Sequence, residues 1–478
     1  MVDRITMCMK KLLGYVALLG TALVLVGCGE DEPLVEPVTP IIKGQSILSG
    51  AIDVTTEPQT VLILFDREVE VYDSSLVTLE PYAPLELTTE EMKLKISILE
   101  HLAYDTEYTL IIGAGAVADK ATAGGNLART IVFRTEEGPH VPSDERTMQL
   151  VSTNALPVAQ ELYSFLWNIY GKATLSGAMS SIAWDLNECD WVRRHTGNYP
   201  VVASFDYQYL HLSPSSSLNY GDIAPVERWW SEGGVVAIDW HWMVPIAEGA
   251  RQYTFLKKET SVTVKNMLTE GTWENQQMKR DLEEVADMLL LLQNENIPVL
   301  WRPLPETQDP RVAACGAGEY YWWCDATTRE YKALWRTMFD YFAERGVRNL
   351  IWVWTSQIED IGYYPGDECV DMVAVGLYNY ASANSMTLEC KLLEEYFPHK
   401  MIALGEMGNL PTLGKQMDGE LFWSYFVPHS DQMNNFTEGF AHSAATIDWW
   451  RRCFEDSRVL SRSSVTALKS YKAIRAIK

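Results

Sequence analysis

The apolar residues of this 478-residue chain follow two different patterns, which change over near residue 140. Before that point, short strand-like apolar runs are separated by turn-forming residues. They occupy residues 61–65, 93–98, 108–112 and 130–133. Runs of this length and spacing predict a small β-sandwich over about residues 44–135. The polar stretch 136–150, which contains two prolines and a glycine, predicts a linker to a second domain.

From residue 151 onward, strand-like runs alternate with helical patterns. The eight strand-like runs are residues 174–179, 200–206, 234–242, 297–306, 349–355, 371–379, 401–406 and 421–426. The clearest helical periodicity covers residues 275–293 and 328–346, where apolar residues recur at three- and four-residue steps. Eight strands alternating with helices predict an α/β fold, a (β/α)8 TIM barrel over residues 151–478, with an open doubly wound sheet as the alternative.

The first 27 residues have the pattern of a secretory signal peptide. Basic residues precede an apolar run, 12–26, that is too short to span a bilayer comfortably. The run ends in Leu-Val-Gly-Cys, which resembles a bacterial lipobox and implies that Cys28 is lipidated. Residues 28–43 then predict an acidic, proline-rich tether between a membrane and the folded protein.

The Gly-Glu-Asp-Glu sequence at 29–32 resembles the surface-export signal of Bacteroidetes lipoproteins, and a simple acidic linker is the alternative interpretation. We therefore predict an outer-membrane lipoprotein that is exposed at the cell surface, with a periplasm-facing orientation as the alternative.

Composition and cysteine usage narrow the partners and cofactors. The chain has 39 basic and 64 acidic residues, and its net charge of -25 argues against nucleic acid and favours a neutral ligand. No glycine-rich phosphate loop follows a strand and no cysteine or histidine has metal-ligand spacing, so we expect neither metal nor cofactor. Cys315 and Cys324 bracket a short loop and are the best disulfide candidate, with buried free thiols as an equally good interpretation.

Two glutamates end strand-like runs that lie three βα units apart. Glu306 closes the fourth run and Glu406 the seventh. In a (β/α)8 barrel the active site lies at the carboxyl ends of the strands, so these two carboxylates are expected to meet there. Paired carboxylates of this kind are what glycoside hydrolysis requires. Arg302, on the same side of its strand as Glu306, is expected to hold carboxylates in place.

The region from about residue 156 to the C-terminus resembles family 26 of the glycoside hydrolases, which are mostly β-1,4-mannanases, and within it the Bacteroides-type surface enzymes. The motifs that carry the resemblance are Leu-Ser-Gly-Ala at 175–178, Tyr-Pro-Val-Val at 199–202, Phe-Asp-Tyr at 205–207, the run 233–242, Trp-Arg-Pro-Leu-Pro-Glu at 301–306, Tyr-Tyr-Trp-Trp at 320–323, Trp-Val-Trp-Thr at 352–355, Tyr-Pro-Gly-Asp at 364–367, Leu-Tyr-Asn at 377–379 and Glu406. The first domain similarly resembles bacterial Ig-like spacer domains, through residues 63–69, 104–110 and 132–135.

The family resemblance implies that Glu306 is the general acid/base and Glu406 the nucleophile of a retaining hydrolase that forms a covalent mannosyl-enzyme. It also implies substrate-binding residues, with His241 on the sugar at the cleavage site, Tyr378 on the nucleophile, and Trp322 and Trp323 as an aromatic platform. These residues are His241, Arg302, Trp322, Trp323, Trp354 and Tyr378. Without the resemblance, a lone histidine, strand tyrosine or tryptophan is more often a core residue.

The sequence departs from the usual family pattern at Pro305, Gly376, His429 and Cys324, where histidine, aspartate, tryptophan and glycine are common. Because these positions border the sugar-binding surface, they bear on the substrate more than on the reaction. One alternative is therefore a retaining β-glycanase acting on xylan or mixed-linkage glucan. A second is a surface lipoprotein that binds mannan without cleaving it. The sequence does not distinguish endo from exo action.

Overall fold

The computed structural model describes residues 36–138, 148–181, 184–306, 320–357, 360–429 and 442–465. The chain divides into two compact units; the main boundary falls between Phe133 and Arg134, and the short segments Ile52–Thr56 and Ala103–Thr106 are grouped with the second unit. The predicted signal peptide and the first half of the predicted tether, residues 28–35 with Cys28, lie outside the described residues. Within them, no helix combines the length and the apolar character needed to cross a bilayer.

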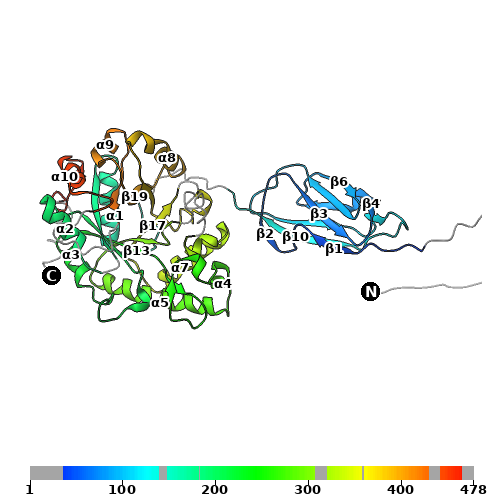
Figure 1. Ribbon diagram of the computed structural model, residues 1–478, viewed down its shortest axis with the longest axis horizontal. Helices are drawn as coiled ribbons and strands as arrows, with labels where there is room; N and C mark the ends of the chain where they lie inside the picture. The colour runs from blue at the N-terminus through cyan, green and yellow to red at the C-terminus, as the bar shows by residue number, and fades with distance from the viewer. Residues whose placement is uncertain are drawn as a thin grey trace, which may run out of the picture. The chain divides into compact units, whose positions relative to one another are not determined.

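The first unit is built from strands (Figure 1). One four-stranded sheet has the order β1 (Ile42–Gln45), β3 (Gln59–Phe65), β7 (Lys93–Ile98), β6 (Leu85–Glu90), and the other has the order β2 (Ala51–Val54), β10 (Arg129–Thr135), β8 (Glu107–Ile112), β5 (Val77–Glu80). A short antiparallel pair joins β4 (Val69–Val71) to β9 (Val117–Asp119). Every second residue of β3 is buried, namely Val61, Ile63 and Phe65. The four apolar runs of this region are therefore strands, as predicted.

The second unit is a closed barrel of eight parallel strands, which confirms the predicted (β/α)8 fold and excludes an open sheet. The strands in order around the barrel are β11 (Thr174–Ser181), β12 (Val202–Asp206), β13 (Val235–Trp240), β16 (Val299–Pro303), β17 (Leu350–Ser356), β18 (Met372–Tyr378), β19 (Met401–Gly408) and β20 (Tyr425–Pro428). The barrel closes because β11 pairs with both β12 and β20. A short strand, β21 (Val459–Leu460), is added beside β11.

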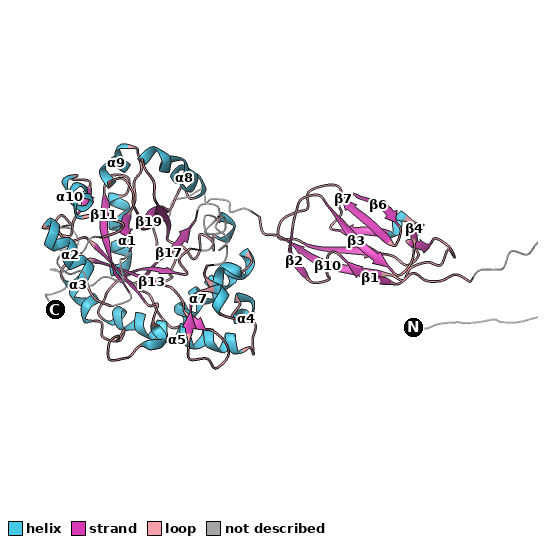
Figure 2. Ribbon diagram, viewed as in Figure 1, coloured by secondary structure: helices cyan, strands magenta, loops and turns pink. Residues whose placement is uncertain are grey.

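Helices surround the barrel strands (Figure 2). They are α1 (Pro157–Ile169), α2 (Asn187–Thr196), α3 (Ala224–Ser231), α4 (Val264–Leu268), α5 (Trp273–Asn294), α7 (Thr328–Glu344), α8 (Ala383–Tyr396), α9 (Leu413–Asp418) and α10 (Ile447–Glu455). Helix α7 begins with a capping box between Thr327 and Glu330, and it ends just before Gly346, whose φ of +77° suits glycine. The two helices predicted at 275–293 and 328–346 are thus present, with ends shifted by no more than two residues.

Two predicted strand ends were wrong. The fourth strand stops at Pro303, three residues before Glu306, because Leu304 and Glu306 adopt positive φ angles of 47° and 64° that no β-strand contains. The eighth strand begins at Tyr425 and not at Leu421. Glu306 therefore sits in a turn beyond the strand and not on the strand itself.

The core of the second unit has two layers. Along β16, Trp301 packs with the side chains that face the helices, while Leu300 belongs to the layer inside the barrel. The same alternation holds on the other strands, so Ala237, Ala374 and Ala403 mark the inward positions of β13, β18 and β19. Larger side chains such as Leu300, Met372 and Met401 fill the same inner layer, and the outer layer carries most of the large aromatic side chains.

The cysteines bear on the disulfide prediction. Cys189, Cys369 and Cys453 are buried free thiols. Cys324 is buried as well, with Sγ 3.8 Å from the carbonyl oxygen of Glu306. Cys315 lies outside the described residues, so its pairing with Cys324 stays a prediction.

Candidate active site

The inward positions nearest the carboxyl ends of the strands carry polar side chains. Continuing in steps of two from the apolar inward layer, β13 presents Asp239 and then His241, and β16 presents Arg302. Strand β18 similarly presents Gly376 and then Tyr378. The alternation of the strands therefore gathers acid, base and phenol groups at one end of the barrel.

A bulge brings Glu406 to the same place. Simple alternation from Ala403 would point residue 405 inward and Glu406 toward the helices. The pairing between β18 and β19 skips Gly405, however, so that Val375 opposes Leu404 and Gly376 opposes Glu406. A bulge of this kind re-aims the next side chain. Glycine is needed at position 405, because a Cβ there would lie 2.9 Å from Nη1 of Arg302.

The carboxylate of Glu406 is held by neighbouring donors. The hydroxyl of Tyr378 donates to Oε1, and Nδ1 of His429 lies 2.7 Å from the same oxygen. Burial alone would raise the pKa of Glu406, but the hydrogen bond to His429, the charges of His429 and Arg302, and the hydrogen bond from Tyr378 outweigh it and lower the pKa to about 2. Glu406 is therefore an anion at neutral pH.

Glu306 lies across Gly376 from this carboxylate. A Cβ on Gly376 would come within 3.3 Å of Oε1 of Glu306, while Gly376 is the register partner of Glu406. The backbone of Glu306 has a positive φ, and its carbonyl oxygen accepts a hydrogen bond of 2.8 Å from Nε1 of Trp323. Strained backbone of this kind is common where function demands a fixed side-chain position. The two predicted carboxylates therefore come together at one end of the barrel.

Two buried ion pairs support the floor of the site. Arg302 makes two hydrogen bonds, of 2.7 and 2.6 Å, to the carboxylate of Asp239. Nδ1 of His241 lies 2.6 Å from Oδ2 of Asp206. Burial lowers the pKa of His241, but the charge and hydrogen bond of Asp206 more than offset this and raise it to about 9. At neutral pH His241 is therefore a cation with Nε2 directed away from its acidic partner.

The predicted tryptophans are not exposed. Trp322, Trp323 and Trp354 are each 0% exposed, whereas an aromatic platform for sugar must present a ring face to solvent. Trp322 donates its N–H to the carbonyl of Trp242, and Trp354 packs in the core against Tyr364 and Phe397. The burial of Trp322 and Trp323 does not fit the predicted platform, and the burial of Trp354 does not fit the contact with substrate predicted for it.

Of the two neighbouring tyrosines, the exposed Tyr320 is better placed for contact with a sugar, because Tyr321 is only 9% exposed. Tyr321 stacks on Trp323 with ring centroids 4.5 Å apart and lies 5.7 Å from the ring of His241. Tyr320 is 46% exposed and packs near Phe255. An aromatic wall made of Tyr320, Tyr321 and Phe255 therefore borders His241.

Sequence reasoning assigned no role to four residues of this site, namely Asp206, Asp239, Tyr321 and His429. The two aspartates carried a readable signal, because each stands near the end of a predicted strand. His429 was noted only as a departure from the family pattern beside the sugar-binding surface, since its contact with Glu406 depends on how β20 is placed beside β19.

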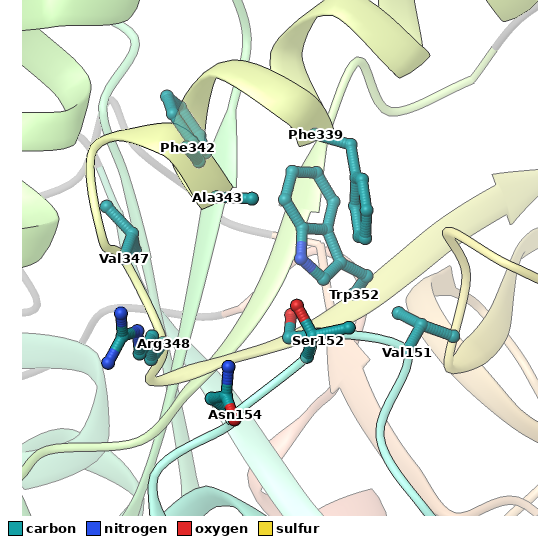
Figure 3. A pocket seen from close by; sticks show the side chains of 10 residues that line it. Val151, Ser152, Asn154, Phe339, Phe342, Ala343, Val347, Arg348 and Trp352 are labelled. Carbon is teal, nitrogen blue, oxygen red and sulfur yellow. The ribbon is translucent and has the colours of Figure 1, made fainter.

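The described residues contain no group of three or more histidine, cysteine, aspartate or glutamate side chains placed to hold a metal ion. They do contain a separate cavity of about 160 Å³ (Figure 3). Its lining comes from the segments before α1 and β17 and from the end of α7, which places it at the amino ends of the strands, opposite Glu306 and Glu406. The lining residues are Val151, Ser152, Thr153, Asn154, Phe339, Phe342, Ala343, Val347, Arg348 and Trp352. In a (β/α)8 barrel that end contributes to stability and does not hold the active site.

The chain is similar to several known proteins. Mannan endo-1,4-beta-mannosidase A of Piromyces sp is 30% identical over 287 residues, which are 58% of this chain and 45% of that protein. The mannan endo-1,4-beta-mannosidase of Thermothelomyces thermophilus is 29% identical over 336 residues, which are 68% of this chain and 66% of that protein. The matched part of this chain spans about half the length of the Piromyces relatives.

Among solved structures, the GH26 domain of an endo-beta-mannanase/endo-beta-glucanase from Prevotella bryantii is 31% identical with a TM-score of 0.60, covering 66% of this chain and 99% of that domain. A beta-mannanase from a symbiotic protist of the termite Reticulitermes speratus, complexed with gluco-manno-oligosaccharide, is 26% identical with a TM-score of 0.56, covering 67% and 98%. The model of glycosyl hydrolase family 26 matches residues 151–463, which include the whole barrel and both glutamates. The chain therefore belongs to glycosyl hydrolase family 26.

Proposed function

We propose that this chain is a retaining endo-β-1,4-mannanase that cleaves mannan or galactomannan, with Glu406 as nucleophile and Glu306 as general acid/base. The observation that carries the proposal is the pair of carboxylates on either side of Gly376, one of them kept ionised by Tyr378, His429 and Arg302. The similarity to mannan endo-1,4-beta-mannosidases and to a beta-mannanase with bound gluco-manno-oligosaccharide supports the substrate class.

In the first step, one oxygen of Glu406 attacks the anomeric carbon as the bond from that carbon to the leaving oxygen breaks. Glu306 gives its proton to the leaving oxygen, so a mannosyl ester of Glu406 forms and Glu306 becomes a carboxylate. The low pKa of Glu406 suits a nucleophile, because the step requires an ionised Glu406 beside a protonated Glu306.

In the second step, Glu306 accepts a proton from water, whose oxygen attacks the same carbon from the face that the leaving group vacated. The bond between the anomeric carbon and Glu406 breaks and its electron pair returns to the carboxylate, which completes retention. Glycosylation removes the charge of Glu406. Glu306 has already given its proton to the leaving oxygen, and without the neighbouring negative charge it remains a carboxylate, so it can now act as the general base that accepts a proton from water.

Sugar binding is assigned to the groups that border the carboxylates. The cationic His241, held by Asp206 through Nδ1, donates from Nε2 to a hydroxyl of the sugar at the cleavage site. Tyr320, which packs at an angle against Tyr321, gives exposed apolar ring surface for the C–H faces of the sugar. Trp323 acts indirectly, since its indole holds the backbone of Glu306.

For the first unit we propose an Ig-like spacer without a site of its own, and for Cys28 a lipid anchor in the outer membrane with the enzyme at the cell surface. The paired four-stranded sheets support the first proposal and the lipobox-like sequence the second. Expression of the chain and of Cys28→Ala with labelled palmitate tests the anchor. Label on the Cys28→Ala variant would count against it.

The activity is tested by reducing-sugar release and product chromatography on mannan, galactomannan, xylan and mixed-linkage glucan. The chain from Pro33 onward is compared with Glu406→Gln and with Glu270→Gln, a matched change at an exposed glutamate. Mannan cleavage that Glu406→Gln abolishes and Glu270→Gln retains would support the proposal, and the product ladder would separate endo from exo action. Cleavage of xylan or glucan alone would change the assigned substrate and leave the proposed mechanism in place. Retardation of the protein in a gel that contains mannan, without cleavage of the mannan, would favour a binding protein.

A further inference from the structure

His429 is fixed beside the proposed nucleophile by its own backbone. It directly follows β20, and its backbone N–H donates a 2.7 Å hydrogen bond to the carbonyl oxygen of Met407, one residue beyond Glu406. The imidazole then reaches Oε1 of Glu406 at 2.7 Å through Nδ1, and its ring lies 6.2 Å from that of Tyr378. A side chain with this anchor approaches Glu406 in one defined direction.

The proton of this hydrogen bond can be assigned from chemistry. An ionised carboxylate only accepts hydrogen bonds, so Nδ1 of His429 must carry a hydrogen whatever the state of Nε2. The hydroxyl of Tyr378 donates to the same oxygen. Both hydrogen bonds that the described side chains make to this carboxylate therefore end on Oε1, and Oε2 is the oxygen left to react.

We propose that His429 is a positioning residue of the nucleophile, which together with Tyr378 fixes Oε1 of Glu406 so that Oε2 attacks the sugar, and which speeds release of the sugar from the covalent intermediate. The inference rests on the proposed function and names a residue that the family resemblance does not supply, since tryptophan is usual at this position.

The effect on the two steps follows from where charge changes. In the first step Glu406 loses negative charge, so a donor on Oε1 gives no acceleration beyond orienting Oε2. In the second step Oε1 begins as the carbonyl oxygen of a neutral ester and regains negative charge as the bond from Oε2 to the sugar breaks. Donors from His429 and Tyr378 then stabilise a charge that develops in the transition state. Loss of His429 should therefore slow the second step most.

Three variants test this with an aryl β-mannobioside whose phenolate is a good leaving group. His429→Ala removes the donor, His429→Asn keeps an amide N–H near the place of Nδ1, and His101→Ala changes an exposed histidine of the first unit. We expect roughly tenfold slower turnover or more for His429→Ala, as for other hydrogen bonds to charged groups, with a burst of about one phenolate per enzyme. His429→Asn should regain most of the rate and lose the burst.

The proposal is overturned if His429→Ala turns over like His101→Ala without a burst, or if His429→Asn is as slow as His429→Ala. A merely structural role would lower the amount of folded enzyme in both variants and would produce no burst. The KM for the mannobioside should stay at or below the original value, because accumulation of the intermediate lowers the apparent KM.

A readout that does not depend on turnover separates this inference from the proposed function. Nitrogen NMR of the chain labelled in its histidine rings, with the His429 signals identified by their loss in His429→Asn, should find Nδ1 protonated at pH 7 and shifted in Glu406→Gln. An unprotonated Nδ1, or no shift in Glu406→Gln, refutes the contact. If no glycan were cleaved, the proposed function would fail, and this measurement would still decide whether His429 holds Glu406.

Discussion

Replacing Asp239 by asparagine should destabilise the barrel far more than the loss of one surface charge. The guanidinium of Arg302 makes two short hydrogen bonds to Asp239, and both side chains are less than 5% exposed. In Asp239→Asn the cation stays buried without its anion, and one amide N–H points at a group that can only donate. The variant thus keeps the volume of the side chain and removes its charge.

The size of the effect follows from burial. Removing one partner of a buried ion pair costs about 3–5 kcal/mol, which for a unit of this size corresponds to a fall in Tm of roughly 10 °C. Burial raises the pKa of Asp239 above its ordinary value even though Arg302 opposes this, so desolvation outweighs the attraction within the pair. For that reason the double variant Asp239→Asn with Arg302→Met should recover part of the lost stability, because no charge is left stranded.

Thermal unfolding followed by circular dichroism, with mannan hydrolysis measured on the same samples, checks both points. Glu270→Gln is the control, since it removes a carboxylate from the exposed pair with Lys279 and should change the free energy of unfolding by less than about 1 kcal/mol. The double variant should stay inactive although it is more stable, because Arg302 lies beside Glu406. If Asp239→Asn lost no more stability than Glu270→Gln, the reasoning about an uncompensated buried charge would be refuted.

Three further predictions concern the site. Tyr378→Phe should lower kcat roughly tenfold or more and leave KM at or below its original value, because it removes a donor to Glu406. Steady-state kinetics on mannan would contradict this by showing a raised KM with an unchanged kcat. Trp323→Phe keeps the stack on Tyr321 but loses the hydrogen bond to the Glu306 carbonyl. We expect kcat to fall several-fold and the free energy of unfolding to fall by about 1 kcal/mol. An unchanged kcat would argue that this hydrogen bond does not position Glu306. The pKa of His241 is raised from 6.5 to about 9, so its pairing with Asp206 stabilises the fold fully below pH 6.5 and is lost as pH rises to 9. The free energy of unfolding, measured with urea, should fall by at most about 3 kcal/mol over that range. His241→Asn should remove this dependence of the free energy of unfolding on pH.

Much of the architecture could be predicted because it is encoded locally. The recurrence of Leu334, Trp335 and Met338 at helical spacing marks the buried face of α7, and the capping box at Thr327 and Glu330 gives its start. The apolar runs likewise gave all eight barrel strands. Periodicity depends on residues only a few positions apart, so it survives without knowledge of the fold.

The errors arose where backbone geometry departs from such local rules. Glu306 was expected at the end of a strand, but Leu304 and Glu306 turn the chain with positive φ angles. Trp322 and Trp323 were expected at the surface and are fully buried. An aromatic sequence does not state which side of a loop faces the core, because that choice depends on neighbours such as Trp242, which are distant in the chain.

The sequence by itself determined the number and order of the barrel strands, the helices between them, and the two glutamates near the carboxyl ends of the fourth and seventh strands, since each of these follows from short-range pattern and position. Tertiary structure alone decided that the bulge at Gly405 turns Glu406 inward, that Asp239 pairs with Arg302, and that His429 reaches Oε1 of Glu406. The physical reason is that these contacts join strands separated by many residues. Their distances are set by how the closed barrel packs, and the local preferences of the chain do not contain that information.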